Sequence, residues 1–235
     1  HTHLHPRPDE IKKCGELYNC RPHQWLEEIG WIDKNVSFAH ISRHNAEELD
    51  IVARNGASVT QSPSCHMRLG YPIAPALEAR DRGIPVSIGV DGGASNDSGD
   101  MLGELRTMLY VHRIDGGHPG YGPERWINAK EVFEMATVNG AKCLNRDDIG
   151  MLKEGMAADL VLFSMIQPGY AGALTDPRGA LLYCGNNHLA DTTIVNGNVL
   201  IENGIFLAGD LNQIVEDANR STARILKLVK DKTGI

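Results

Sequence analysis

The chain lacks the features that mark two large classes of protein. No stretch approaches the roughly 20 consecutive apolar residues of a membrane-spanning helix. Positive charge is not in excess either, since the formal net charge is −7. Nucleic acids and anionic membrane surfaces are bound by clustered cations. The composition therefore argues against nucleic acid or membrane as the main partner and favours small molecules.

Cysteine is scarce and unpatterned. The five cysteines are odd in number and form no C-x-x-C pair. This argues against a disulfide framework and against a cysteine-based zinc site. These cysteines are Cys14, Cys20, Cys65, Cys143 and Cys184. We therefore expect the protein in a reducing, cytoplasmic location.

Apolar runs and helical patterns alternate along the first part of the chain. Strands are expected at 1–4, 36–40, 57–61 and 84–90, with amphipathic helices between them. For one such helix, at 46–55, Asn45 or Ser42 is the expected N-cap. This alternation predicts parallel β/α units with right-handed crossovers. The 235 residues, 42% of them hydrophobic, are enough for one barrel-sized domain or two smaller ones.

Three of the predicted strands end near residues that bind metals. The first strand carries His3, the second ends at His40, and Asp91 follows the apolar run 84–90 and opens a glycine-rich turn. The carboxyl ends of parallel strands lie at one edge of a sheet, where α/β barrels place catalytic groups. A single histidine at a strand end is commonly structural. Two imidazoles and a carboxylate at such positions instead match the composition of a metal site.

The pattern changes near residue 150. The segment 150–164 reads as a turn followed by a strand, and 192–204 reads as a hairpin whose Asn-Gly pair is a strong turn signal. An amphipathic helix is expected at the end. We therefore predict three parts, which are barrel units at 1–149, a β appendage at 150–209 and a terminal helix at 210–235.

The ordered combination of these motifs resembles a known superfamily. HTHL, FAH, the SPSCHMRLG loop, GVDGGASND and GMAADLVLF follow one another as they do in amidohydrolases. The resemblance is to the members that act on N-heteroaromatic rings, such as guanine, 8-oxoguanine, isoxanthopterin and S-adenosylhomocysteine deaminases and s-triazine hydrolases. It implies the C-terminal half of a (β/α)₈ barrel with a small β-sandwich appendage.

The resemblance also implies roles for individual residues. His3 and Asp91 match metal ligands, and His40 and Asp91 match catalytic residues. His40, His66 and Arg68 are the expected substrate-binding residues, although a structural ion pair is an equal alternative for Arg68. The implied cofactor is Zn²⁺, or another divalent ion such as Fe²⁺. Hydrolytic deamination needs a hydroxide at neutral pH, and zinc supplies one by lowering the pKa of a bound water to about 7.

One position departs from the superfamily pattern. Relatives commonly carry a glutamate three residues after the first ligand, where it passes protons to the leaving amine, but this chain has Pro6. Proline cannot transfer a proton. His5, Asp9 and Glu10 are the nearby candidates for that role, although residues at such positions are more often solvated loop residues.

The resemblance implies hydrolytic deamination of a purine, pterin or triazine. Ring-amide hydrolysis, dechlorination or dealkylation of a triazine, and a non-catalytic barrel fragment are the alternatives. The zinc cytidine deaminases and the Ser-His-Asp hydrolases are excluded, because H-x-E with P-C-x-x-C and G-x-S-x-G are missing. The chain opens inside a strand pattern, which predicts a missing N-terminal half of the barrel as a partner. The alternative is that the first residues are an expression tag, and a homo-oligomer stays possible.

Overall fold

The chain forms two compact units. The computed structural model describes residues 1–4, 7–114, 122–185 and 189–234. The first unit comprises His1–Ala157 with Met165–His188, and the second comprises Ala158–Ser164 with Leu189–Ile235. The three predicted domain ranges stay predictions.

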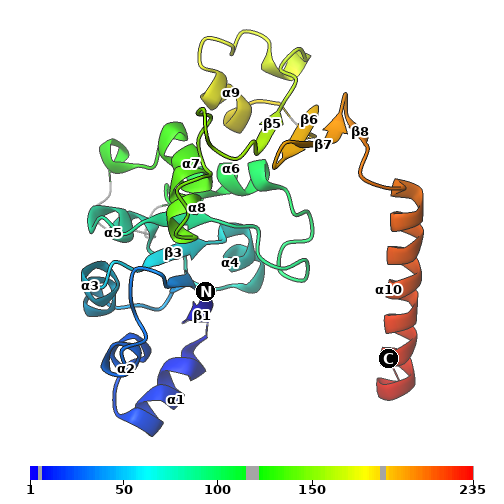
Figure 1. Cartoon of the computed structure of the whole chain (residues 1–235). Helices are drawn as coiled ribbons and strands as arrows, with labels where there is room; N and C mark the ends of the chain where they lie inside the picture. Colours follow the sequence, from blue (N-terminus) through cyan, green and yellow to red (C-terminus); the bar gives the residue numbers. More distant parts are fainter. Residues whose placement is uncertain (5–6, 115–121, 186–188, 235) are drawn as a thin grey trace. The chain divides into compact units, whose positions relative to one another are not determined.

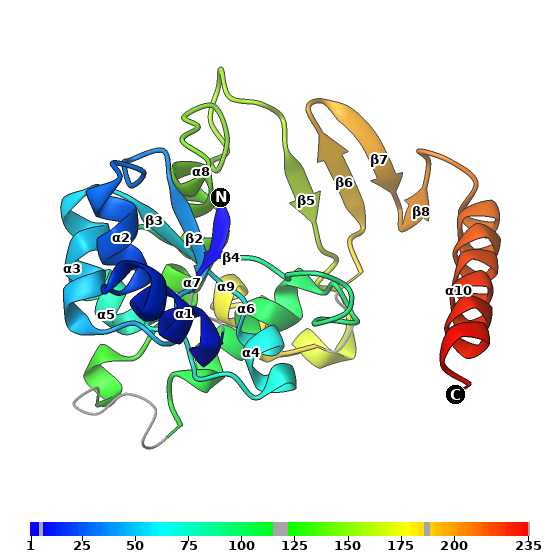
Figure 2. The same cartoon turned by 90° about the horizontal axis from the view of Figure 1, so that it is seen from below.

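The first unit is built on a parallel sheet (Figures 1 and 2). Its strands lie in the order β1-β2-β3-β4, and every neighbouring pair is parallel. Helices α7 and α8 pack against β4. The elements are β1 (Thr2–Leu4), α1 (Pro8–Tyr18), α2 (Pro22–Glu28), β2 (Ser37–His40), α3 (Ala46–Arg54), β3 (Ser58–Gln61), α4 (Pro63–Leu69), α5 (Ala76–Asp81), β4 (Val86–Ile88), α6 (Met101–Val111), α7 (Ala129–Ala136), α8 (Val138–Cys143) and α9 (Pro177–Tyr183), with single 3₁₀ turns at Pro123–Arg125 and Pro168–Tyr170.

Strands β2, β3 and β4 form the buried part of this sheet. Phe38 of β2 and Val59 of β3 have no exposed surface. Fully buried strands are expected in a parallel sheet that is covered by helices. The prediction of an α/β fold with parallel β/α units is confirmed.

Local sequence explains where α3 begins. Asn45 accepts a hydrogen bond from the backbone N–H of Glu48 at 2.9 Å, and the Glu48 carboxylate accepts one from the N–H of Asn45 at 3.0 Å. This reciprocal pair is a capping box. Asn45, rather than Ser42, is therefore the N-cap.

One predicted boundary was wrong, and one helical segment is divided. The segment 129–144 forms α7 and α8 and is broken at Thr137, whose hydroxyl donates to the carbonyl of Phe133 at 2.6 Å and whose φ and ψ are −125° and −91°. Such a side-chain bond competes with the helical pattern. The expected loop after β3 contains α4, which starts with Pro63 and stops at Gly70 in the left-handed region.

The second unit contains an antiparallel sheet in the order β5-β6-β7-β8. The predicted hairpin joins β6 to β7 through Asn196 and Gly197, whose φ values of 47° and 80° suit a tight hairpin turn. The bounds are β5 (Leu160–Leu162), β6 (Thr192–Val195), β7 (Asn198–Glu202), β8 (Ile205–Phe206) and α10 (Leu211–Thr233). Among the described residues, no helix has the length and hydropathy needed to cross a membrane.

Candidate functional site

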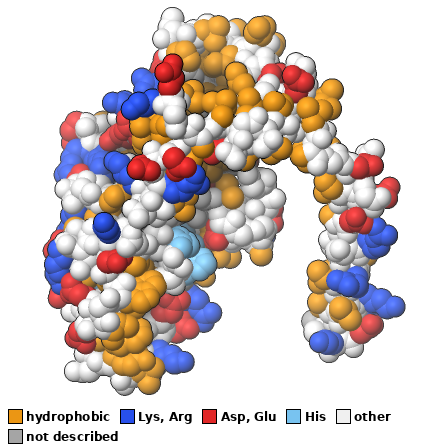
Figure 3. Space-filling model, in the orientation of Figure 1, with side chains coloured by type: hydrophobic (Ala, Val, Ile, Leu, Met, Phe, Trp, Pro, Cys, Tyr) orange, Lys and Arg blue, Asp and Glu red, His pale blue; other side chains and the backbone are white. Residues whose placement is uncertain are grey.

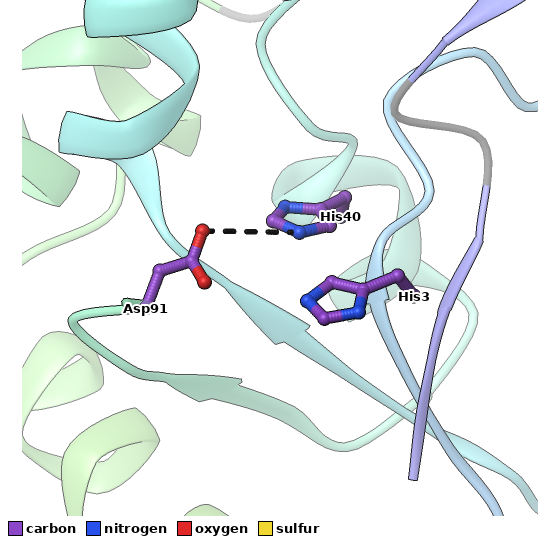
Figure 4. Close-up of side chains that lie close together, drawn as sticks. All are labelled: His3, His40 and Asp91. Carbon is purple, nitrogen blue, oxygen red and sulfur yellow. Dashed lines mark ion pairs between the residues drawn. The ribbon is translucent and has the colours of Figure 1, made fainter. Parts of the chain in front are cut away.

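Three of the predicted site residues lie together at one edge of the parallel sheet. One nitrogen of His3, one nitrogen of His40 and one carboxylate oxygen of Asp91 all lie within 4.8 Å of one another. The two imidazole rings and the carboxylate converge on the same point (Figure 4). We call these three residues the metal-type cluster.

The two histidines come from neighbouring strands. His3 lies opposite Ala39 in the β1–β2 ladder, and His40 lies opposite Leu4. The rings nevertheless stack, with centroids 4.9 Å apart and an interplanar angle of 15°. At His40 the backbone turns to a φ of 73°, which ends the alternation of the strand at this residue.

The backbone of the cluster is unusual at two of its three members. Besides His40, Asp91 has a positive φ of 64°, and Ile41, next to His40, has a φ of 42°. A β-branched residue rarely adopts this region. Strained backbone of this kind is concentrated at functional sites. The strain therefore marks the strand ends that carry the cluster.

His40 is the buried member of the cluster. Its Nδ1 lies 2.9 Å from Nε2 of His66, and its Nε2 lies 4.0 Å from Oδ2 of Asp91. Burial, and to a lesser degree the neighbouring imidazoles of His66 and His3, lowers the pKa of His40 to about 4, although the Asp91 carboxylate opposes this shift. His40 is therefore a neutral imidazole at neutral pH.

Asp91 is held in the anionic form. Partial burial works to raise its pKa, but hydrogen bonds from the Cys65 thiol, the Gly92 N–H and Ser95 outweigh burial and lower the pKa below its usual range. The bond from the Gly92 N–H to Oδ1 measures 2.8 Å. An ionised carboxylate is the form that binds a metal ion.

Sequence reasoning missed Cys65. This buried residue of α4 has its thiol against the Asp91 carboxylate, and burial together with that carboxylate raises the thiol pKa to about 11. The thiol is thus a protonated hydrogen-bond donor. Its place directly before His66 in the SPSCHMRLG motif was the available signal.

The remaining predicted residues lie on α4. His66 is 1% exposed, and both ring nitrogens have protein partners, Nε2 with His40 and Nδ1 with the carbonyl of Pro72 at 2.9 Å. Arg68 pairs with Asp97 at 2.5 Å, and both side chains are at least half exposed. The structure thus brings His66 into contact with the cluster and places Arg68 in a surface ion pair.

The candidates for the missing proton shuttle are only partly described. His5 and Pro6 lie outside the described residues. Asp9 accepts two hydrogen bonds from the Arg7 guanidinium, at 3.0 and 2.7 Å, on an exposed surface. Glu10 lines an apolar groove beside α1 and β1. Both acids lie in the first turn of α1.

A buried glutamate joins α4 to the turn that follows Asp91. Glu104 on α6 accepts from the N–H of Ser64 at 2.9 Å and from the side-chain amide of Asn96 at 3.1 Å. Ser64 precedes Cys65, and Asn96 belongs to the turn that follows Asp91. Burial raises the pKa of Glu104 despite these bonds. The carboxylate therefore holds the α4 segment to the Asp91 turn.

The donor set fits a divalent ion. Two imidazoles and one carboxylate are ligands that zinc and ferrous iron both accept. Protein zinc sites with a catalytic role keep at least one position open to water or substrate. The cluster therefore has the chemistry of part of a divalent-metal site.

Comparisons with known proteins agree with this geometry. A model of the amidohydrolase family matches residues 1–200. A 5-methylthioadenosine/S-adenosylhomocysteine deaminase of Desulfitobacterium hafniense is 32% identical over 94% of this chain and 49% of its own length. An 8-oxoguanine deaminase of Pseudomonas aeruginosa is 35% identical over 92% of this chain and 46% of its own length.

A solved structure is also similar to this chain. The structure of atrazine chlorohydrolase TrzN from Arthrobacter aurescens complexed with zinc superposes with a TM-score of 0.87 at 35% identity, over 94% of this chain and 48% of its own. The chain spans about half the length of the relatives that it matches. The match to half of a barrel-type fold confirms the predicted fold class. The chain belongs to the amidohydrolase family.

Proposed function

We propose that the polypeptide containing this chain is a metal-dependent hydrolase that removes an exocyclic amine from an N-heteroaromatic ring. The substrate class is an amino-substituted purine, pterin or triazine. In this proposal His3 and Asp91 bind the metal, Asp91 and His40 take part in the chemical step, and His40, His66 and Arg68 face the substrate. The ion is zinc, with ferrous iron as the alternative.

One observation carries the proposal. Donor atoms of His3, His40 and Asp91, from elements far apart in the sequence, lie within 4.8 Å of one another. Asp91 is anionic and His40 is neutral, so both are in the protonation state that metal binding requires. The matched relatives carry names of deaminases and of a triazine hydrolase that contains zinc.

A bound divalent ion supplies a water activated for attack at neutral pH. The overall reaction forms a C–O bond to the ring carbon and breaks the C–N bond, so that the amine leaves as ammonia. Asp91 accepts a proton from the attacking water on the carboxylate edge that faces His40, and this proton then passes to the departing amine, which restores the carboxylate. Its lowered pKa makes it a weak base. The transfer therefore depends on position more than on basicity.

The other residues act on the substrate. His40 presents Nε2 to the reacting atoms, 4.0 Å from Oδ2 of Asp91. Arg68 offers a planar fork of donors that suits a ring carbonyl, although it must leave Asp97 to use all of them. His66 reaches substrate only if it exchanges one of its two protein partners.

Triazine hydrolysis is the second candidate. The zinc-complexed atrazine chlorohydrolase is 35% identical over 94% of this chain, which is as similar as the purine deaminases are. In that case the leaving group is chloride or an alkylamine. Ring-amide hydrolysis uses the same cluster and stays a further alternative.

We propose that further β/α units complete the barrel as the partner of this chain. In the described sheet β1 and β4 are edge strands, and a closed barrel has none. An apolar groove of about 400 Å³ lies beside β1, lined by residues that include Leu4, Leu17, Trp25 and Trp31. Figure 3 shows hydrophobic side chains gathered over α1 and α2. The remaining half of each relative has the length that such units need.

An ammonia-release screen tests the function. The natural polypeptide that contains this chain, loaded with zinc, is assayed on aminopurines, aminopterins and aminotriazines, with chloride release followed in parallel on chlorotriazines. We expect ammonia from at least one class, and none from an Asp91→Asn variant. Chloride without ammonia would favour the second candidate. Activity on lactams alone would favour ring-amide hydrolysis. A folded, metal-loaded protein with no activity on any of these classes would favour the non-catalytic alternative.

A further inference from the structure

We propose that His66 is a positioning residue that fixes the tautomer of His40 and thereby aims the Nε2 lone pair of His40 at the metal-type cluster. The role differs from substrate binding. It rests on a chain of two hydrogen bonds that runs from the Pro72 carbonyl through both imidazoles.

The direction of the hydrogen bond at the Pro72 end of this pair is defined. Nδ1 of His66 lies 2.9 Å from the carbonyl oxygen of Pro72. A carbonyl oxygen only accepts, so the proton of this bond belongs to Nδ1 of His66. A neutral imidazole carries a single ring proton. Nε2 of a neutral His66 therefore has a free lone pair.

The second bond takes its direction from the first. Nε2 of His66 lies 2.9 Å from Nδ1 of His40, and one proton occupies the space between these nitrogens. If Nε2 of His66 accepts, Nδ1 of His40 must donate. The ring proton of His40 is then on Nδ1. Its Nε2, which lies 4.0 Å from Oδ2 of Asp91, is left as an acceptor.

The surroundings of His66 favour the neutral ring on which this direction depends. The residue is 1% exposed, and its hydrogen-bond partners are a carbonyl and a second imidazole. The other groups that face the pair are the His3 ring, stacked on His40, the Tyr71 ring, which meets His66 edge-on at 6.1 Å, and the Asp91 carboxylate, 4.0 Å from Nε2 of His40. The carboxylate alone among them favours a charged ring, and it approaches His40 on the side away from His66. A buried cation in contact with another imidazole is costly.

The consequence is a specific use of His40. An Nε2 lone pair can bind a cation or accept a proton, and it cannot donate a hydrogen bond to a ring nitrogen. Histidine ligands commonly have their other nitrogen fixed by such an outer partner. Here that partner is a second histidine, which is in turn fixed by the backbone of Pro72. The inference rests on the proposed function only in treating the cluster as a metal site.

Nitrogen chemical shifts of the histidine side chains test the tautomer directly. They are measured on the metal-free natural polypeptide containing this chain, isotopically labelled, at neutral pH and without substrate. We expect protonated Nδ1 and unprotonated Nε2 for both His40 and His66. A His40 ring protonated at Nε2 would overturn the inference, whatever the enzyme's substrate proves to be.

Two variants separate positioning from packing. The His66→Gln variant keeps a hydrogen-bond acceptor within reach of His40, whereas the His66→Leu variant removes it. We expect His66→Gln to retain the Nδ1–H form of His40 and His66→Leu to shift it toward Nε2–H. Zinc affinity should fall by roughly 10- to 100-fold in His66→Leu and recover at least in part in His66→Gln.

His44 provides the matched control. Its Nδ1 bonds the carbonyl of Ile41 at 3.1 Å, so it is also a histidine held by backbone, but it is not part of the cluster. His44→Gln should leave both the His40 tautomer and zinc affinity unchanged. Equal losses of zinc affinity in His66→Gln, His66→Leu and His44→Gln would show a general loss of packing and contradict the proposal. If His66→Leu does not fold, the proposal is still tested by the His40 tautomer in the wild type and in His66→Gln.

Discussion

The imidazole of His3 stacks on the imidazole of His40 with ring centroids 4.9 Å apart. His3 is exposed and His40 is buried, so one face of this stack is open and the other is fixed by the protein. Asp91 approaches the same pair from the end of β4 (Figure 4). This arrangement gives different expectations for each of the three residues.

The first prediction concerns metal content. We expect about one zinc-like ion per natural polypeptide, with ligand distances near 2.0–2.2 Å. His3→Ala removes an exposed imidazole, so it should lower metal occupancy with little effect on folding. Elemental analysis of dialysed protein and circular dichroism measure the two effects. Full activity after complete removal of metal would contradict the proposed function.

The second prediction concerns Asp91. Replacing it with Asn keeps the shape but removes the negative charge and basicity, so kcat should fall by about 100-fold or more while the fold survives. Steady-state kinetics with a thermal melt measures both. The control is Asp50→Asn, an exposed carboxylate on α3 paired with Arg82. Unchanged turnover of a folded Asp91→Asn protein would remove Asp91 from the mechanism.

The third prediction concerns Arg68. Its ion pair with Asp97 is half exposed, so breaking it should change the free energy of unfolding by less than about 1 kcal/mol. If Arg68 binds substrate, Arg68→Met should raise KM, while Arg82→Met on α5's C-terminal side should not. Denaturant unfolding and KM for the best substrate are the two measurements. A loss of stability with unchanged KM would favour the purely structural role.

Parts of the site followed from sequence because they depend on topology. His3, His40 and Asp91 were expected together, since the carboxyl ends of parallel strands share one edge. The Asn196-Gly197 hairpin was predictable because its turn chemistry is local. The first feature requires only the order of the elements, and the second requires only the residues of the turn.

Other parts depend on contacts that no local pattern reports. The left-handed backbone at His40 and Asp91 is unusual for either residue in isolation and is imposed by the surrounding fold. The contact of the Cys65 thiol with Asp91 joins helix α4 to the turn that follows β4. The two bonds that occupy His66 likewise appear only once α4 is placed beside β2.

The fourth prediction concerns the pH dependence of stability. Burial lowers the pKa of His40 to about 4 and also lowers the pKa of His44 and His66. Protons therefore bind more tightly to the unfolded chain, and protonation favours unfolding. For the metal-free protein, stability should be fully present above the ordinary histidine pKa of about 6.5 and decline as the pH falls toward 4.

Denaturant unfolding at a series of pH values checks this expectation. His40→Gln cannot titrate, so its profile should be flatter than that of the wild type over the same range. The buried Glu104, whose pKa is raised, acts in the opposite direction and limits the decline. Stability that rises steadily from neutral pH toward 4 would show that the histidines are not buried as described.

The last prediction concerns the edges of the parallel sheet. In the described sheet β1 pairs only with β2 and β4 only with β3, so each has one side without a strand partner. If further β/α units close the barrel, the outward amides of β1 and β4 form hydrogen bonds in the natural polypeptide and exchange slowly with solvent. Hydrogen exchange followed by mass spectrometry measures this protection. Trp25→Asp, placed in the apolar groove beside β1, should weaken the docking of those units and speed exchange at β1 more than at β4. Fast exchange at both strands in the folded, active protein would mean that the sheet is open and that the metal-type cluster works without a closed barrel.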